Sequence, residues 1–356
     1  MQFFNKETKT ALQAKEAALW IAFAPVVFQA AKALRDLGIL KAISENGMKG
    51  VTIEEIIEKT GLTRYGVRVL VEAGLGMEML IINEEKKYVL TKTGHFIEHD
   101  YLTRINMDFS NDICYKGMFH LQEAITEGKP AGLKELGPWE TIYEGLTILP
   151  PKEGASWYNF DHYYSDLAFP QVLPIVFQDK PLKLLDIGGN TGKFTMACFA
   201  HDPEVKITIF DLPGQVARAT KNITEAGYID RVSFHVNNIL DESIPFPTGF
   251  DVIWMSQFLD CFSEDEITSI LSRCREALTD DGSVYILEPF WDKQVFKSAA
   301  FCLQQTSLYF TAMANGNSQM YFSEVFYECV KKAGLQIVNE NHSMGLSYTL
   351  LQCKKA

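Results

Sequence analysis

A glycine-rich segment at residues 184–192 is the part of the sequence whose residue types and spacing point most directly to chemistry. It reads LLDIGGNTG, so a short apolar run leads straight into the glycines. Glycines allow a chain to turn tightly and to approach a ligand without a side-chain clash. In open α/β sheets, ligands bind at the carboxyl ends of strands. The residues that we expect to form a ligand-binding loop here are Asp186, Gly188, Gly189, Asn190 and Gly192.

The spacing of this loop differs from two common nucleotide-binding patterns. A dinucleotide fingerprint reads G-x-G-x-x-G, but Asn190 and Lys193 occupy the third and sixth positions counted from Gly188. A P-loop has a Lys followed by Ser or Thr, whereas Lys193 is followed by Phe194. The spacing therefore argues against an NAD-dependent oxidoreductase and against a P-loop nucleotidase.

The segment resembles the glycine-rich first motif of class I methyltransferases. That motif has two hydrophobic residues, an Asp, a further hydrophobic residue and then G-x-G-x-G. Asn190 replaces the middle glycine of the motif, and Asn tolerates left-handed backbone geometry better than most residues. The resemblance implies that the loop binds S-adenosylmethionine, with S-adenosylhomocysteine as the product.

A carboxylate stands directly after the next apolar run, which spans residues 206–210. Asp211 and Leu212 follow this run, and a carboxylate in that place can accept hydrogen bonds from both ribose hydroxyls of an adenosyl group. The alternative is an Asp that only forms the turn after a strand. With the glycine loop beside it, we expect Asp211 and Leu212 to bind the cofactor.

Two further pairs of residues follow later apolar runs. Asn238 and Ile239 come after residues 232–236, where methyltransferases of this class contact the adenine. An acidic residue is usual there, but the side-chain amide of Asn238 can also hydrogen-bond the base. Ser256 and Gln257 come after the fourth run and complete the expected cofactor-binding residues.

The second half of the chain alternates short apolar runs with helical stretches. This alternation predicts an α/β domain with a doubly wound parallel sheet. The last two strands are separated by a short loop and follow a single helix, so they are expected to form a terminal hairpin. We expect helices between the first five strands, and place strands at 183–185, 206–210, 232–236, 252–255, 284–287, 335–339 and 348–352.

The first half of the chain reads as mainly helical. The stretch 15–37 is apolar almost all round, as in a helix that is buried on several sides, and a partner subunit would be a plausible cover. Helices at 53–59 and 64–80 precede short apolar runs at 80–82 and 88–90. This is the pattern of a helix-turn-helix followed by a β-wing.

A winged helix can bind DNA or serve as a scaffold for dimerisation. The second helix of the pair carries Arg64 and Arg68 but also Glu72 and Glu78. The whole chain has 33 Lys and Arg against 45 Asp and Glu, with a formal net charge of -12. An acidic surface repels nucleic acid and anionic membranes, so we expect a dimerisation scaffold and no nucleic-acid partner.

Other compositional features argue for a globular protein of the cytoplasm. The first ten residues are polar, and the stretch 17–28 contains Pro25 and is shorter than the ~20 residues of a membrane span. We therefore expect no membrane association. The seven Cys are scattered without the spacing of a metal site, which indicates reduced thiols and no bound metal.

The whole chain resembles the small-molecule O-methyltransferases of the plant caffeate/flavonoid and bacterial polyketide type. The Asp-Leu-Pro sequence at 211–213 is characteristic of them. The resemblance implies a planar hydroxylated acceptor and a homodimer formed through the N-terminal domain, which partly covers the active site. The expected divisions are a winged-helix-like dimerisation domain (1–105), an aromatic helical linker region (106–180) and a cofactor-binding catalytic domain (181–356).

The sequence departs from this family at the catalytic base. Aligned with the family motif after the fourth strand, Asp260 stands where a His removes the acceptor proton, and Glu288 matches an acidic residue that supports the His. We expect Asp260 and Glu288 to be the catalytic residues. Three activities remain open: O-methylation, methylation of an amine, and a relative that binds the cofactor without methylating. Alternatively, Asp260 is only a helix N-terminal acid.

The acceptor pocket is expected to be lined by aromatic and Met side chains from two segments of the sequence. The stretch before the first strand is rich in aromatic residues, and the segment before the last helix forms the acceptor wall in the family. Such side chains are equally common in ordinary cores. The residues that we expect to line the pocket are Phe160, His162, Tyr164, Phe301, Tyr309 and Met313.

Overall fold

The computed structural model describes residues 3–356, which form two compact units, residues 3–110 and 111–356. The two units therefore divide between Ser110 and Asn111. The domain boundaries expected from the sequence, after residues 105 and 180, remain predictions. Residues 111–180 belong to the same compact unit as the sheet.

The unit 3–110 is helical with one small hairpin, as the sequence indicated. Thr52 and Glu55 form the capping box of α3 through Glu55 N and the Thr52 hydroxyl at 3.2 Å. Strands β1 and β2 pair antiparallel and follow the helix pair α3 and α4 in the chain. Its elements are α1 (Ala11–Asp36), α2 (Ile39–Ser44), η1 (Gly47–Lys49), α3 (Ile53–Thr60), α4 (Arg64–Gly76), β1 (Leu80–Ile82), β2 (Tyr88–Leu90), α5 (Lys92–His99) and α6 (Tyr101–Phe109).

Helix α1 differs from the expectation of a buried helix. Its C-terminal part packs into the unit through Ala31 and Leu34. Farther toward the N-terminus, Ile21 is 75% exposed and Val26 is 64% exposed. By length and composition alone, α1 is also a helix that could cross a membrane. Among residues 3–356 no other segment buries these side chains, so the prediction of burial is wrong for the single chain, and cover by a partner subunit stays a prediction.

The unit 111–356 begins with short helices that lead into the sheet. Two of them, α9 and α10, come directly before the first strand. The elements before the sheet are η2 (Ser110–Cys114), η3 (Gly117–His120), α7 (Leu121–Glu127), η4 (Ala131–Glu135), α8 (Ile142–Gly145), α9 (Pro151–Asp166) and α10 (Phe169–Val176).

A seven-stranded sheet forms the centre of this unit, in the order β5-β4-β3-β6-β7-β9-β8. The first five strands along the chain pair in parallel, and β9 lies antiparallel between β7 and β8. The predicted doubly wound sheet with a terminal hairpin is confirmed. The strands are β3 (Lys183–Ile187), β4 (Lys206–Asp211), β5 (Val232–Val236), β6 (Phe250–Ser256), β7 (Leu278–Glu288), β8 (Leu335–Met344) and β9 (Tyr348–Lys355).

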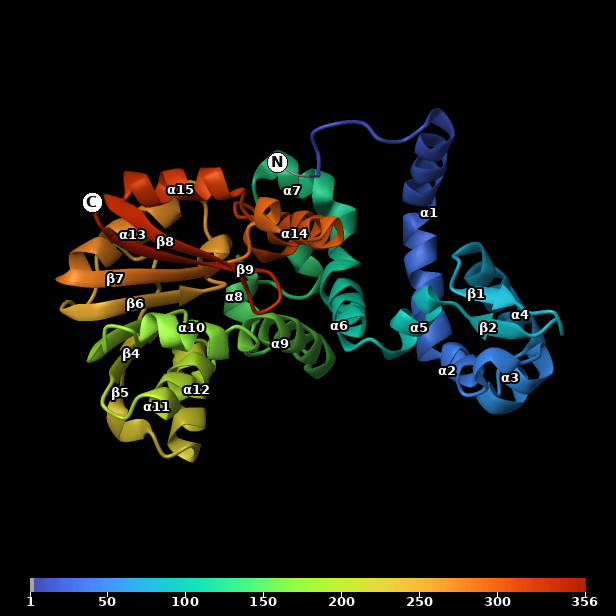
Figure 1. Ribbon diagram of the computed structural model, residues 1–356, viewed down its shortest axis with the longest axis horizontal. Coiled ribbons are helices and arrows are strands. Elements are labelled where there is room, and N and C mark those ends of the chain that lie inside the picture. The colour runs from blue at the N-terminus through green and yellow to red at the C-terminus, as the bar shows by residue number, and fades with distance from the viewer. Residues whose placement is uncertain (1–2) are drawn as a thin grey trace. The chain divides into compact units, whose positions relative to one another are not determined.

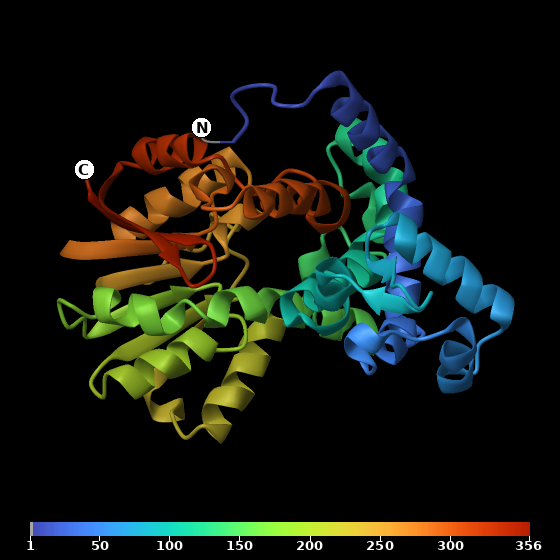
Figure 2. The ribbon, with the colours of Figure 1, turned by 45° about the vertical axis from the view of Figure 1, so that its right-hand side comes forward.

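Helices cover both faces of the sheet. Helices α13 and α15 pack on one face, and α10 and α11 pack on the other, where α12 also lies (Figure 1). Figure 2 shows the hairpin of β8 and β9 at one edge of the sheet. The remaining elements are α11 (Lys193–His201), α12 (Pro213–Glu225), η5 (Ile229–Arg231), η6 (Leu259–Cys261), α13 (Glu264–Ala277), η7 (Trp291–Lys293), α14 (Lys297–Tyr309), η8 (Phe310–Ala314) and α15 (Ser323–Lys332).

One predicted helix is missing. The chain between β5 and β6 forms turns and extended segments without a helix over residues 237–249. Pro245 and Pro247 stand in this segment, and each proline removes a backbone donor and disfavours helical geometry in the residue before it. The prediction of helices between all of the first five strands is therefore wrong at this connection.

Aromatic stacking joins helix α11, which follows β3, to β6, the central strand of the sheet. The rings of Phe194 on α11 and Trp254 on β6 are 4.0 Å apart at an angle of 10°. Both side chains are almost fully buried, with exposed fractions of 4% and 1%. This contact holds the start of α11, and with it the end of the glycine loop, against β6.

Shortening a side chain in the central strand should destabilise the unit strongly. Ile253 on β6 is fully buried, so Ile253→Ala should lower the free energy of unfolding by about 2–5 kcal/mol through lost burial and a cavity. The control is Ile148→Ala, because Ile148 is 66% exposed. Thermal and denaturant unfolding of both variants measure the effect, and equal losses would contradict the assigned core.

Candidate functional site

The glycine loop joins β3 to α11 and requires unusual backbone geometry. Gly188 has φ 72°, Gly192 has φ 81° and Asn190 has φ 49°. A Cβ atom on Gly188 would lie 2.3 Å from Cδ2 of the Phe258 ring. Glycine is therefore needed at 188 for space as well as for backbone conformation. Asn190 adopts the left-handed geometry that its residue type tolerates.

Two carboxylates hold this loop. The Asp211 Oδ2 atom accepts a hydrogen bond from Asn190 N at 2.8 Å, and Oδ1 accepts one from Leu212 N at 2.7 Å. Burial raises the pKa of Asp211 to about 6 despite these bonds. Asp186 lies below the loop and accepts from the Thr195 hydroxyl at 2.6 Å, and burial raises its pKa to about 7.

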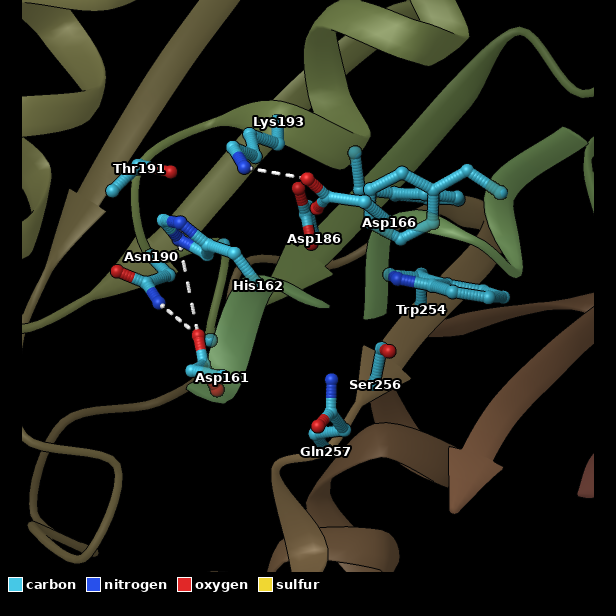
Figure 3. A pocket seen from close by; sticks show the side chains of 14 residues that line it. Asp161, His162, Asp166, Asp186, Asn190, Thr191, Lys193, Trp254, Ser256 and Gln257 are labelled. Carbon is cyan, nitrogen blue, oxygen red and sulfur yellow. Dashed lines mark hydrogen bonds and ion pairs between the residues drawn. The ribbon is translucent and has the colours of Figure 1, made fainter. Parts of the chain in front are cut away.

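A pocket opens between the loop, the end of β6 and helix α9 (Figure 3). The empty space within and in front of it is about 500 Å³, which includes open solvent. The structure brings together six residues predicted to bind the cofactor, and adds several that were not. The lining residues are Asp161, His162, Asp166, Phe169, Asp186, Gly188, Gly189, Asn190, Thr191, Lys193, Phe194, Trp254, Ser256 and Gln257.

Helix α9 supplies residues that the sequence did not single out. Asp161 Oδ2 accepts a hydrogen bond from Asn190 Nδ2 at 3.1 Å, and Asp166 Oδ2 accepts one from Lys193 Nζ at 2.5 Å (Figure 3). Burial, together with the charge of Asp260, raises the pKa of Asp161 to about 7. Lys193 directly follows the glycine motif and could have been noticed from the sequence. No local pattern shows that α9 packs across the loop.

The two neighbouring residues that were predicted to contact the adenine differ in burial. Asn238 is exposed, and its Oδ1 atom already accepts a hydrogen bond from Leu240 N at 3.0 Å. Ile239 is buried in the core of the sheet domain. Asn237, which the sequence interpretation passed over, has a buried Nδ2 atom without a hydrogen-bond partner among the described residues.

Unsatisfied polar atoms around the loop indicate what the pocket can hold. They come from the ends of β5 and β6, from the loop itself and from α12. Buried polar atoms in native proteins usually have hydrogen-bond partners, so a ligand with many donors and acceptors, such as a nucleoside, fits this set. The buried atoms without a partner among the described residues include Asn190 Oδ1, Gln215 Oε1, Asn237 Nδ2 and Ser256 Oγ.

A pair of buried acids lies beyond Ser256 and Gln257. Glu288, at the end of β7, accepts hydrogen bonds at Oε1 from Phe258 N at 3.0 Å and Leu259 N at 2.8 Å. Asp260 follows directly and is 5% exposed, while Glu288 is 2% exposed. Burial raises the pKa of Asp260 to about 7. Burial and the charge of Asp260 raise the pKa of Glu288 well above its ordinary value.

The geometry of Asp260 differs from that of an ordinary acid at a helix start. Ser263 is the N-cap of α13 and forms a capping box with Glu266. The acids in the first turn are Glu264, Asp265 and Glu266. Asp260 lies outside this turn, in η6, and is buried. The dipole of α13 therefore does not account for a carboxyl group at this position.

The residues expected in the acceptor pocket do not all come together. Met313 is fully buried, and a Cβ atom on Gly117 would lie 1.8 Å from its sulfur, so the two are in contact. The Tyr309 hydroxyl accepts a hydrogen bond from Trp157 Nε1 at 2.9 Å. His162 lines the pocket of the glycine loop, with Nε2 3.9 Å from Asp161 Oδ2.

Three further predicted acceptor residues lie on helices α9 and α14. Phe301 on α14 is 57% exposed, and its place in an acceptor pocket stays a prediction. Its helix presents this face outward. Phe160 and Tyr164 lie one turn apart on α9 with ring centroids 5.2 Å apart, and Tyr164 packs against the core next to α10. Among residues 3–356, no group of His, Cys, Asp and Glu is arranged to hold a metal ion.

Comparison with known proteins shows to which cofactor-binding family the glycine loop belongs. The O-methyltransferase domain matches residues 163–336, which contain the glycine loop, Asp211 and the acid pair. A dimerisation2-like domain matches residues 15–88. The chain belongs to the S-adenosylmethionine-dependent O-methyltransferase family. It is a methyltransferase that acts on small molecules, and its first unit contains a dimerisation domain.

Relatives of this methyltransferase transfer methyl groups to different atoms. The L-tyrosine C(3)-methyltransferase of Streptomyces lavendulae is 24% identical over 90% of this chain and 86% of its own. The demethylspheroidene O-methyltransferase of Cereibacter sphaeroides is 25% identical over 72% of this chain and 65% of its own. The apo structure of the S-adenosylmethionine-dependent methyltransferase SibL has a TM-score of 0.72 and 22% identity, and covers 95% of this chain and 98% of its own.

Removing the charge of Asp211 should weaken binding of the cofactor. Hydrogen bonds to a charged group contribute about 1.5–3 kcal/mol, so Asp211→Asn should raise the Kd for S-adenosylhomocysteine roughly 10- to 150-fold. Asp202→Asn is the matched control, because Asp202 also accepts two backbone hydrogen bonds but lies at the C-terminal end of α11. Calorimetric titration measures both variants, and an unchanged Kd for Asp211→Asn would contradict the assigned site.

Proposed function

We propose that this methyltransferase transfers the methyl group of S-adenosylmethionine to a hydroxyl oxygen of an apolar aromatic small molecule. The observation that carries this proposal is the buried pair Asp260 and Glu288. Asp260 comes shortly after Ser256 and Gln257, which line the pocket of the glycine loop, and Glu288 accepts hydrogen bonds from Phe258 N and Leu259 N in the same segment. This arrangement supports a proton acceptor near the expected place of the methyl donor.

The residues in the pocket, together with Asp211 and Asn237 outside its lining, fit the donor by their chemistry. Asp211 would accept hydrogen bonds from the ribose hydroxyls, and the buried atoms Ser256 Oγ and Asn237 Nδ2 offer further polar contacts. When bound, S-adenosylmethionine supplies a methyl group on a positively charged sulfur. Holding acceptor and donor in line can contribute up to ~7–11 kcal/mol to lowering the barrier, and the rigid loop and strand ends provide that positioning.

The acid pair would take the proton of the acceptor. An ordinary Asp, with a pKa of about 3.9, is a poor base toward a phenol of pKa about 10. Burial raises the pKa of Asp260 to about 7, which reduces this mismatch. Two neighbouring carboxylates in a dry site repel each other when both are charged. Protonation of Asp260 relieves its repulsion with Glu288, so proton uptake by the pair is favoured.

Methylation of a ring carbon is the second candidate. It is supported by the similarity, over 90% of this chain, to the L-tyrosine C(3)-methyltransferase of Streptomyces lavendulae. Loss of the phenol proton makes both the oxygen and the neighbouring ring carbon nucleophilic. Attack by carbon would form a carbon–carbon bond while the bond between the methyl group and the sulfur of the donor breaks, and the ring would then lose the proton of that carbon. Mass and NMR spectra of the product distinguish a methoxy group from a ring methyl group.

The rate of methyl transfer should depend on the charge of Asp260. The carboxylate is the active form, so kcat should rise with pH through about 7 and fall below it as Asp260 is protonated. Asp260→Asn should lower kcat by about 10²–10⁴-fold and remove this pH dependence. A panel of phenols and catechols, with release of S-adenosylhomocysteine as the signal, provides the assay.

The control for this prediction is Asp265→Asn, because Asp265 is exposed in the first turn of α13. Its kcat and pH profile should match those of the unaltered protein. The Kd for S-adenosylhomocysteine should be the same in all three proteins. A full rate with Asp260→Asn would show that the proton leaves by another route.

We also propose that α1 pairs with a second copy of the chain. Leu19 and Phe23 lie one turn apart on α1 and are 54% and 59% exposed, within the match to the dimerisation2-like domain. The double variant Leu19→Glu, Phe23→Glu should convert a dimer into a 40.2 kDa monomer, because charges are costly in an apolar interface. Light scattering measures the mass, with Ile148→Glu on the other unit as the control. A monomeric unaltered protein, or its recovery only with membranes, would contradict the proposal.

A further inference from the structure

Helix α9 is joined to the glycine loop and the start of α11 by two separate polar bridges inside the pocket. Asp161 Oδ2 accepts a hydrogen bond from Asn190 Nδ2 at 3.1 Å, and Asp166 Oδ2 accepts one from Lys193 Nζ at 2.5 Å (Figure 3). All four residues line the pocket. One wall of the pocket is therefore made by two carboxyl groups of α9 that are held in place from the opposite side.

The bridge at Asn190 depends on the departure of this chain from the glycine-rich motif. A glycine, which the motif has at this position, carries no amide that could reach Asp161. Asn190 keeps the left-handed backbone of the loop, with φ 49°, and its backbone N donates to Asp211 Oδ2 at 2.8 Å. The residue is thus fixed through both its backbone and its side chain, and it orients the carboxyl group of Asp161.

The lining of the pocket carries more acidic groups than basic ones. Asp161, Asp166 and Asp186 all contribute to it, whereas Lys193 is the only Lys or Arg among the described residues that line it. Lys193 pairs with Asp166. His162 Nε2 lies 3.9 Å from Asp161 Oδ2 but adds no charge at neutral pH, because burial lowers the pKa of His162 to about 4. A ligand that brings a positive charge to Asp161 complements this wall.

The donor offers two positive charges, one on its sulfur and one on the α-amino group of its amino acid end. An ammonium group has three N–H donors, whereas a sulfonium has none. A carboxylate forms a charge-assisted hydrogen bond only with a donor, and such a bond is about twice as strong as a neutral one. The chemistry of Asp161 therefore favours the ammonium group over the sulfonium.

We propose that Asp161 binds the α-ammonium group of S-adenosylmethionine and that Asn190 is the positioning residue for this contact. Lys193, in the same lining, has the charge that matches the carboxylate of the same amino acid end. The site then selects ligands with an intact amino acid end, in addition to the adenosyl group. This inference rests on the part of the proposed function that places the donor in this pocket.

Three adenosyl ligands without a sulfonium test the inference by calorimetric titration. They are S-adenosylhomocysteine, its analogue without the α-amino group (5′-S-(3-carboxypropyl)-5′-thioadenosine), and 5′-methylthioadenosine, which lacks the whole amino acid end. The unaltered protein should bind S-adenosylhomocysteine roughly 10- to 150-fold more tightly than the deaminated analogue, the effect of a hydrogen bond to a charged group. Asp161→Asn and Asn190→Gly should each reduce this preference several-fold and leave the Kd for 5′-methylthioadenosine unchanged.

Both variants are chosen to keep the rest of the pocket. Asparagine at position 161 retains an oxygen that accepts the bond from Asn190, and glycine at position 190 adopts a positive φ freely. The control is Asp202→Asn, because Asp202 also accepts hydrogen bonds but lies at the C-terminal end of α11. It should keep the full preference for the amine. Thermal unfolding identifies a variant that fails to fold, and the other variant then decides.

Equal binding of S-adenosylhomocysteine and the deaminated analogue by the unaltered protein overturns the inference. A full preference for the amine in either folded variant does so too. If both variants weaken all three ligands alike, the bridge only ties α9 to the loop, and the inference is also overturned. The same holds if Asp161→Asn weakens S-adenosylmethionine but not S-adenosylhomocysteine, because the carboxylate then serves the sulfonium.

These outcomes are separate from those of the proposed function. Methyl transfer to phenols with no preference for the amine leaves the proposed function standing while the inference fails. A preference for the amine that both variants lose supports the inference, even where no phenol is methylated, and that lack of transfer counts against the proposed function. Failure of all three ligands to bind the unaltered protein contradicts the placement of the donor, and with it both proposals.

Discussion

The two hydrogen bonds from Phe258 N and Leu259 N to Glu288 are the contact on which the rest of the site depends. They tie the segment after β6 to the end of β7. Asp260 follows in this segment, so the bonds also fix its carboxyl group. The Phe258 ring packs against Gly188, where a Cβ atom would have no room. One buried carboxylate thus couples the acid pair to the glycine loop.

Burial determines the electrostatics of the whole site. Asp161, Asp186, Asp211 and Asp260 have pKa values of about 6–7, and in each case desolvation is the largest cause. Carboxyl groups with such values exchange protons near neutral pH. They also favour a bound cation, because a positive charge nearby stabilises their charged form. The donor carries a positive sulfur, so an acid-rich pocket suits it.

The distribution of buried and exposed apolar side chains also accounts for the role of the unit 3–110. Its core is built from α1 to α4 and the hairpin, with Leu34, Ile43, Val67 and Val71 fully buried. Most of α1 extends beyond this core with apolar side chains on its surface. Exposed apolar area of this extent marks an interaction surface. A helix that is apolar all round can pack against a partner copy on one face and retain its own contacts on another.

The amino-acid sequence by itself determined the local elements and the chemistry of the loop. Alternating runs, capping boxes at Thr52 and Ser263 and the spacing of the glycines depend on neighbours within a few residues. The side chains that fill the site depend on contacts between distant segments. Packing of α9 across the loop brings Asp161 to Asn190, and pairing of β7 with β9 brings Thr349 opposite Glu288. Burial, which gives Asp260 its raised pKa and leaves Phe301 in solvent, exists only once the sheet and helices are assembled.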